Sequence, residues 1–317
     1  MPLRPHRIVL ARPRRRQFPV IIEAVESRRL LSASFFVSVS GSDANAGTSA
    51  DAPWQTISRV NGRALEPGDS VLFEGGATFE GTLRLDAGDS GTPEQPVVVG
   101  SYGDGRATIR SGAATAVGVY NTSGLVVRDL VLTGDGVGAN GSDGVQVYTD
   151  RAGDDRPGHV RLENLDVSGY GGWGVSIGGW NGPDAGWRDV RVTHSALHDN
   201  GKGGLVTYAQ AGRPNEQVYV GHVRAFDNHG TSSATERSGD GILLANVDGA
   251  NVEHSVAHGN GALNFNASSG PVGIWAWESN AVVLQFNESF DNRTGGDADG
   301  GGFDFDGGVT DSVMQYN

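Results

Sequence analysis

Two aspartates near the end of the chain, Asp304 and Asp306, have the residue type and spacing of a catalytic pair. In a β-strand, residues two apart point to the same face, and their Cα atoms lie about 6.6 Å apart. Hydrolysis of a glycosidic bond uses two carboxyl groups, about 5–5.5 Å apart for retention and about 6.5–9.5 Å apart for inversion of configuration. The spacing is compatible with both, so it does not select a mechanism.

Aromatic residues follow the same alternation close to this pair. Trp275 and Trp277 are also two residues apart, and Tyr208 stands at a similar position further upstream. Outward-facing Trp rings expose much apolar surface, which calls for a ligand or a covering segment. Because a sugar ring has an apolar C–H face, the three residues predict a sugar-binding surface. The alternative is that a long loop covers the Trp pair and the aspartates cap turns.

Three further aspartates are candidates for the same groove. Asp240 precedes a Gly at the start of a similar strand, where it is either a third catalytic acid or a common turn residue. Asp297 and Asp299 bring the number of carboxylates to four within ten residues. Hard cations such as Ca²⁺ prefer oxygen ligands of this kind, although the segment lacks the Glu that ends an EF-hand loop. Calcium is therefore the one cofactor that the sequence indicates, through Asp297 and Asp299.

Lysine and histidine offer other chemistry. Lys202, the only lysine, lies in a Gly-rich turn and is either the base of an elimination on uronates or, as we favour, a solvated charge. The motif His-Ser-x-x-His occurs at 194–198 and at 254–258. Facing histidines can bind metal, but their place in a repeat favours a structural role in turns.

A repeated unit must position these residues. Each unit begins with a Gly followed by an apolar residue, at positions 118, 144, 174, 204, 241, 273 and 302. Most units contain a turn that ends in Asn, at positions 200, 228, 260 and 292, and we expect these side chains to stack on one another. Self-similarity at a spacing of 26–37 residues is typical of a solenoid.

The fold class that this pattern predicts is all-β, a single-stranded right-handed parallel β-helix with an N-terminal cap. Apolar residues alternate with period two, and no helical stripe links the units. Coils lie about 4.8 Å apart, so Trp275 and Trp277 should neighbour Asp304 and Asp306 on one outer face.

The chain divides into three predicted segments. Residues 1–33 form a basic leader, residues 34–115 a cap with a short helix at 58–65 and the first coils, and residues 116–317 the repeats. The last three residues repeat 285–287 and stop within a coil, so we expect a C-terminal remainder of a longer chain.

Composition narrows the partners. The chain has 317 residues, 50 of them Gly, and no Cys. Beyond the leader, 16 basic and 35 acidic residues give a net charge of −19, which argues against binding to nucleic acid. No apolar run reaches 18 residues, so no membrane span is predicted. A polysaccharide, neutral or bridged by a cation, suits this charge.

Two resemblances add to this interpretation. Val-Glu-Ser-Arg-Arg-Leu-Leu-Ser-Ala at 25–33 resembles the Leu-Glu-Pro-Arg-x-Leu-Leu sorting signal of planctomycete-type bacteria, and departs from it at Val25 and Ser27. The resemblance implies an extracellular or cell-surface location.

The second resemblance covers residues 35–317. The entry segment at 35–48, Pro-Gly-Asp-Ser-Val at 67–71 and Gly-Gly-Gly-Phe-Asp-Phe-Asp-Gly-Gly at 300–308 resemble extracellular proteins of the pectate-lyase-like β-helix superfamily. Members cleave or bind polysaccharides, but no full polygalacturonase or lyase signature is present. Two functions stay open, a glycosidase or polysaccharide lyase, and a non-catalytic glycan-binding or structural surface module of a larger protein.

Overall fold

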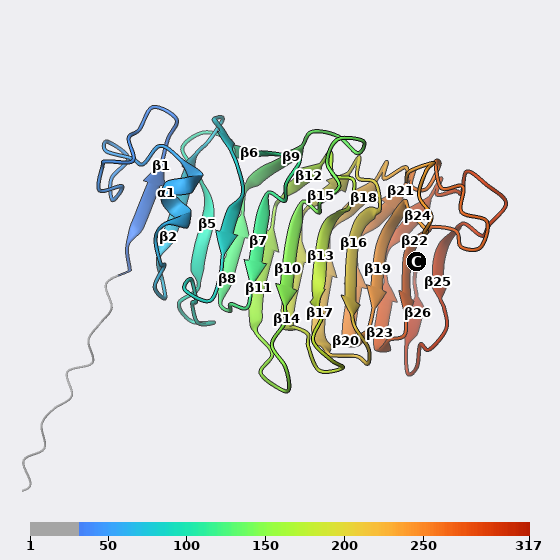
Figure 1. Ribbon diagram of the computed structural model, residues 1–317. Helices are drawn as coiled ribbons and strands as arrows, with labels where there is room; N and C mark the ends of the chain where they lie inside the picture. The colour runs from blue at the N-terminus through green and yellow to red at the C-terminus, as the bar shows by residue number, and fades with distance from the viewer. Residues whose placement is uncertain (1–31) are drawn as a thin grey trace, which may run out of the picture. The chain divides into compact units, whose positions relative to one another are not determined.

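Short strands repeat three to a coil in the computed structural model, which describes residues 32–317. Figure 1 shows them side by side from the blue to the red end of the solenoid. Residues 1–31 of the predicted leader, and with them most of the predicted sorting signal, lie outside the described residues. Every strand pair is parallel, and equivalent strands of successive coils form three sheets, which confirms the predicted all-β parallel β-helix.

The three sheets are named here by letter. Sheet A contains β1 (Ser34–Val37), β2 (Ser70–Glu74), β5 (Val97–Tyr102), β8 (Leu125–Arg128), β11 (Gly158–Glu163), β14 (Arg188–Thr193), β17 (Asn215–Gly221), β20 (Val247–Glu253), β23 (Asn280–Gln285) and β26 (Val313–Gln315). Sheet B contains β3 (Thr78–Glu80), β6 (Ala107–Gly112), β9 (Leu130–Gly134), β12 (Asp166–Ser168), β15 (Ala196–His198), β18 (Arg224–Phe226), β21 (Val256–His258) and β24 (Glu288–Phe290). Sheet C contains β4 (Leu83–Leu85), β7 (Val117–Tyr120), β10 (Val145–Thr149), β13 (Trp173–Gly179), β16 (Gly203–Ala209), β19 (Asp240–Ala245), β22 (Val272–Trp277) and β25 (Gly301–Phe305).

The predicted register of sheet C is correct from the second unit onward. Its inward positions pair in sequence as Val145, Val175, Leu205, Ile242, Ile274 and Phe303. The first unit is different, because Val117 rather than Val119 pairs with Val145. The predicted start at Gly118 is therefore wrong by two residues, since this Gly takes an outward position and the unit begins at Ala116.

One short helix, α1 (Ile57–Asn61), follows β1. Thr56 caps it by accepting a hydrogen bond from the Arg59 amide, and Gly62 ends it, so it is shorter than the predicted 58–65. Ile57 and Val60 are buried against the first coils. Within residues 32–317, no helix has the length and hydrophobicity needed to cross a membrane.

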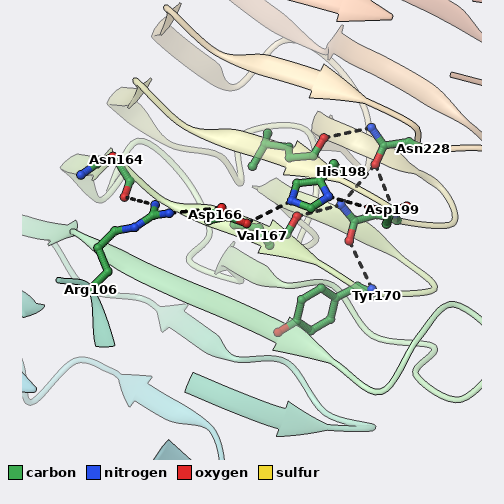
Figure 2. A network of polar contacts seen from close by, with 10 residues as sticks. Arg106, Asn164, Asp166, Val167, Tyr170, His198, Asp199 and Asn228 are labelled. Carbon is green, nitrogen blue, oxygen red and sulfur yellow. Dashed lines mark hydrogen bonds and ion pairs between the residues drawn. The ribbon is translucent and has the colours of Figure 1, made fainter. Parts of the chain in front are cut away.

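The repeated Asn residues form a buried ladder between sheets B and C. The Asn228 side chain donates to Leu197 O and to the Asn260 carboxamide, and accepts hydrogen bonds from the backbone and side chain of Asn200. Figure 2 shows the part of this ladder around Asn228. Each Asn thus satisfies backbone groups that a buried turn would otherwise leave unpaired, which is the structural role expected from the repeat.

Aromatic and His side chains stack in two further columns. His194, His222, His254, Phe286 and Tyr316 form one column, and His198, Phe226, His258 and Phe290 form the other. The centroid distances between neighbouring rings are 4.7–5.3 Å, close to the spacing between coils. The His-Ser-x-x-His motifs therefore contribute rings to stacks.

Candidate functional site

The outer face of sheet C carries the candidate residues in two columns. Register pairing defines the first column, which consists of Arg84, Gly118, Gln146, Ser176, Val206, Leu243, Trp275 and Asp304. The second column lies two residues further along each strand and contains Tyr120, Tyr148, Gly178, Tyr208, Ala245 and Trp277. Trp275 therefore lies directly beside Asp304, as the coil pattern predicts.

Asp304 and Asp306 both point outward and are exposed at the end of β25. Partial burial raises the pKa of Asp304 above the ordinary value, and the negative charges of Asp306 and Asp299 raise it further. The Asp306 carboxylate accepts a hydrogen bond of 2.7 Å from the Gly307 amide. The carboxyl groups of Asp304, which is partly desolvated, and Asp306, which is hydrogen-bonded to Gly307, thus lie together at the end of β25.

The two tryptophans differ in access. Trp277 is 43% exposed, and its indole nitrogen lies close to Gly307, next to Asp306. Trp275 is only 3% exposed, because the Arg237 guanidinium lies 4.3 Å from its ring centroid. Of the predicted Trp pair, only Trp277 presents an open ring beside the aspartates.

Asp240 lies beneath this cover, 1% exposed. One carboxylate oxygen accepts hydrogen bonds from the Val272 amide and the Trp275 indole, and the other accepts one of 2.9 Å from Arg237. Burial raises the pKa of Asp240, while Arg237 and the hydrogen bonds oppose this rise. Asp240 thus fastens Trp275 and the start of β22, and solvent does not reach it.

Tyr208 is half-buried, two coils away from Trp277 along sheet C. Its ring covers Gly178, where an added Cβ would lie 2.7 Å from the ring. It packs against an apolar cluster on the outer face, called the apolar block below, which consists of Val206, Leu243, Ala245, Val272 and Trp275. Tyr208 therefore packs with covered residues and does not lie beside Trp277.

Asp297 and Asp299 are exposed in the loop between β24 and β25. Within the described part of the chain, no group of three or more His, Asp or Glu side chains is placed to hold a metal ion. Asp299 lies close enough to Asp304 to affect its pKa. The acidic loop thus acts electrostatically on the aspartate pair, and its predicted role as a calcium ligand stays a prediction.

Arginines from distant loops shape this end of the sheet, and the sequence analysis missed them. Arg237 covers Trp275 and also donates to the Ser269 hydroxyl. Arg213 donates to the carbonyl oxygens of Glu278 and Gly308, tying two turns together beside the strand ends. Their loops follow no period, so no signal in the repeat marks these residues.

Lys202 is exposed in the turn before β16. It lines a pocket of about 370 Å³ together with Glu236 and Arg237. The register places β16 three strands away from β25 in sheet C, so Lys202 is not a neighbour of Asp304.

Comparisons with known proteins agree with this architecture. A segment of 110 residues is 36% identical to lacto-N-biosidase of Bifidobacterium longum subsp. longum, covering 30% of this chain and 7% of that protein. The solved structure of GH136 lacto-N-biosidase from Eubacterium ramulus matches with a TM-score of 0.68 at 20% identity. Pectate lyase Pel9A matches with a TM-score of 0.51 at 16% identity. No protein-family model matches the chain.

The two structural matches show the fold. Each covers 90% of this chain, and they cover 55% of the GH136 chain and 79% of Pel9A. This chain therefore spans about half of the solved lacto-N-biosidase and a small part of the curated one. It shares its parallel β-helix with carbohydrate-active enzymes.

Proposed function

We propose that this protein is an exported glycan-active enzyme that hydrolyses a glycosidic bond at the end of sheet C. Asp304 is the general acid, Asp306 is the second carboxylate, and Trp277 is the platform for the sugar ring. The observation that carries the proposal is the pairing of Asp304, whose pKa is raised, with a second exposed carboxylate beside an open Trp ring.

The environment of each group supports its role. A carboxyl whose pKa is raised stays protonated at higher pH and can donate its proton to the leaving oxygen. The bond between the anomeric carbon and that oxygen breaks, and water supplies the hydroxyl that joins the anomeric carbon. Asp306 acts either as the base on this water or as the nucleophile of a covalent intermediate. Trp277 holds the apolar face of the sugar beside the two carboxyl groups.

The similarity to lacto-N-biosidases favours hydrolysis over elimination. The 110-residue match rests on 36% sequence identity, against 20% for the matching solved structure. Lacto-N-biosidase activity belongs to that relative, and its substrate class is the first to test here. The resemblance at residues 25–33 supports a location outside the cell, and such a location suits an acidic, carbohydrate-facing solenoid.

The test is product formation on a glycan panel that includes a chromogenic lacto-N-bioside, pectin and alginate. Hydrolysis is measured as reducing-sugar release, and elimination as absorbance at 235 nm. We expect Asp304→Asn and Asp306→Asn to lose about 10²–10⁴-fold in kcat. Asp291→Asn removes another exposed carboxylate from the turn after sheet B and should leave kcat unchanged.

One result would overturn the enzyme proposal. If no panel member yields product while glycans still bind, the protein is a non-catalytic binding module. Product that absorbs at 235 nm and survives Asp304→Asn would reject the hydrolase assignment.

A further inference from the structure

A second pocket lies on the outer face of sheet C, over β4, β7 and β10. Its volume is about 230 Å³, and its outward-facing lining consists of Arg84, Asp86, Gly118, Tyr120, Gln146 and Tyr148. Pockets for drug-sized ligands measure about 300–1,000 Å³, so this one is limited to about a single ring.

Gly118 makes the pocket a slot. Register places it directly between Arg84 on one neighbouring strand and Gln146 on the other. Two coil spacings separate these flanking residues, which gives about 9.6 Å between their Cα atoms. Nothing lies within 4 Å of a Cβ added at Gly118. Because Gly118 has no side chain, the space between the Arg84 and Gln146 side chains is open down to the backbone of β7.

An aromatic ring forms the end wall of the slot. Tyr120 is 43% exposed and stacks on Tyr148 with centroids 6.0 Å apart and an interplanar angle of 8°. Since β10 lies on one side of β7 and β4 on the other, the face of Tyr120 away from Tyr148 is turned toward β4. The residue that follows β4 on this side, Asp86, is too short to stack there.

The Tyr120 ring is held in place before any ligand arrives. Its hydroxyl donates a hydrogen bond of 2.7 Å to the Asp150 carboxylate, which also accepts one from the Asn121 side chain. A fixed ring loses little conformational entropy on binding, which favours affinity. The slot thus combines a rigid aromatic face with a cation, a carboxylate and a carboxamide at its edges.

We propose that this slot is a second glycan-binding site, which takes one pyranose unit of an extended, neutral glycan. The apolar C–H face of the sugar packs on Tyr120, and its hydroxyl groups hydrogen-bond with Arg84, Asp86 and Gln146. This proposal rests on the proposed function for the choice of a glycan as the ligand, and on the geometry of the slot for everything else. Charges of both signs at the rim, with no excess of cations, suit a neutral sugar better than a uronate.

The slot is separate from the aspartate pair. Five coil steps lie between β10 and β25, which corresponds to about 24 Å along the sheet. The apolar block occupies three of the strands between them, β16, β19 and β22. A glycan of several units can therefore reach the slot with one part and the aspartates with another.

Gly118→Val tests the slot directly. Val is a good strand residue with space around its Cβ, so the variant should melt at the same temperature as the wild type or higher. It should bind members of an array of immobilised neutral oligosaccharides of one to six units at least tenfold more weakly. Tyr120→Ala should have a similar effect. Tyr316→Ala removes an even more exposed ring from the turn after sheet A and should bind like the wild type.

Hydrolysis and array binding, measured on the same preparation, distinguish a failure of the slot from a failure of the proposed catalytic site. Gly118→Val should leave hydrolysis of a chromogenic glycoside of one or two units unchanged and should lower kcat/KM on long glycans about tenfold. If no substrate is hydrolysed but array binding still depends on Gly118 and Tyr120, the proposed enzyme fails and the slot stands. Unchanged array binding in both folded variants would overturn the slot.

Discussion

The turns of the solenoid and the outer face of sheet C differ in how their residue types change from coil to coil. In the turns, one residue type recurs from coil to coil, as in the ladder of Asn200, Asn228, Asn260 and Asn292. On the outer face, the first column changes from Arg to Gly, Gln, Ser, Val, Leu, Trp and Asp. Repetition thus marks positions whose partner is the next coil, and variation marks positions free for other roles.

The physical reason lies in the spacing of the coils. Identical side chains about 4.8 Å apart can satisfy one another, so each member of a ladder stabilises two neighbours. The outer face of sheet C has no such requirement. Its side chains instead differ in exposure: the apolar block on β16, β19 and β22 is covered, whereas open groups lie on β7 and β25.

The largest stability effect should come from the ladder. Asn228→Ala leaves the buried Leu197 carbonyl and Asn200 amide of the preceding coil without these partners and breaks both side-chain links of the ladder at this position, and we expect a loss of about 3 kcal/mol in the free energy of unfolding. Urea denaturation measures it. Asn292→Ala removes the same kind of bonds at a partly exposed end, where water can replace them, and should cost about half as much. Equal losses would contradict the importance of position in the ladder.

The covered part of sheet C should respond next. Arg237→Met keeps an apolar chain over Trp275 but removes the cation from buried Asp240, and about 2 kcal/mol should be lost near pH 8. Without Arg237, the pKa of Asp240 rises further above its unfolded value, so the penalty develops as pH rises above about 4. Urea denaturation at pH 4 and pH 8 should therefore show the smaller loss at pH 4. A loss that does not depend on pH would show that Asp240 is not the group affected.

The same contrast explains how much the sequence could predict. The register of β10 to β25 followed from period-two alternation, because nearly all inward positions of these strands hold apolar residues, with Thr207 as an exception. The error at Gly118 arose where the motif residue sits in an outward position. The neighbours Trp275 and Asp304 were predicted correctly, since register alone brings them together.

Cover over the outer face could not be predicted in this way. Arg237 reaches Trp275 from a loop whose conformation depends on tertiary contacts with Asp240 and Ser269. The alternation therefore gave Trp275 and Trp277 the same role, whereas the structure buries one of them and exposes the other. In a solenoid, the coils are readable from the sequence and the loops that cover them are not.

A polar network on the outer face of sheet B should give a smaller, pH-dependent effect. His198 bonds to Asp166 and Asp199, which raise its pKa, and Figure 2 shows this network. Because the folded pKa is raised, the stabilisation is present below about pH 6.5 and is lost as pH rises through the folded value. His198→Phe keeps a ring to stack on Phe226 but has no titration. The free energy of unfolding of the wild type relative to this variant should fall by no more than about 1 kcal/mol between pH 5.5 and pH 9, since solvent screens the pair.

The smallest expected effect concerns the acidic loop beside the proposed catalytic pair. Asp299 helps to raise the pKa of Asp304, so Asp299→Asn lowers that pKa. If Asp304 is the general acid, activity falls as pH rises through its pKa, and the alkaline limb of kcat should move to lower pH by a few tenths of a unit. The charge of Asp291 does not contribute to the pKa of Asp304, so Asp291→Asn should leave the alkaline limb in place. A calcium site at Asp297 and Asp299 would give another result, in which chelation changes activity and Asp299→Asn abolishes that sensitivity. A shift of the alkaline limb to lower pH, without any effect of chelation, would show that this loop acts on the aspartates through charge alone.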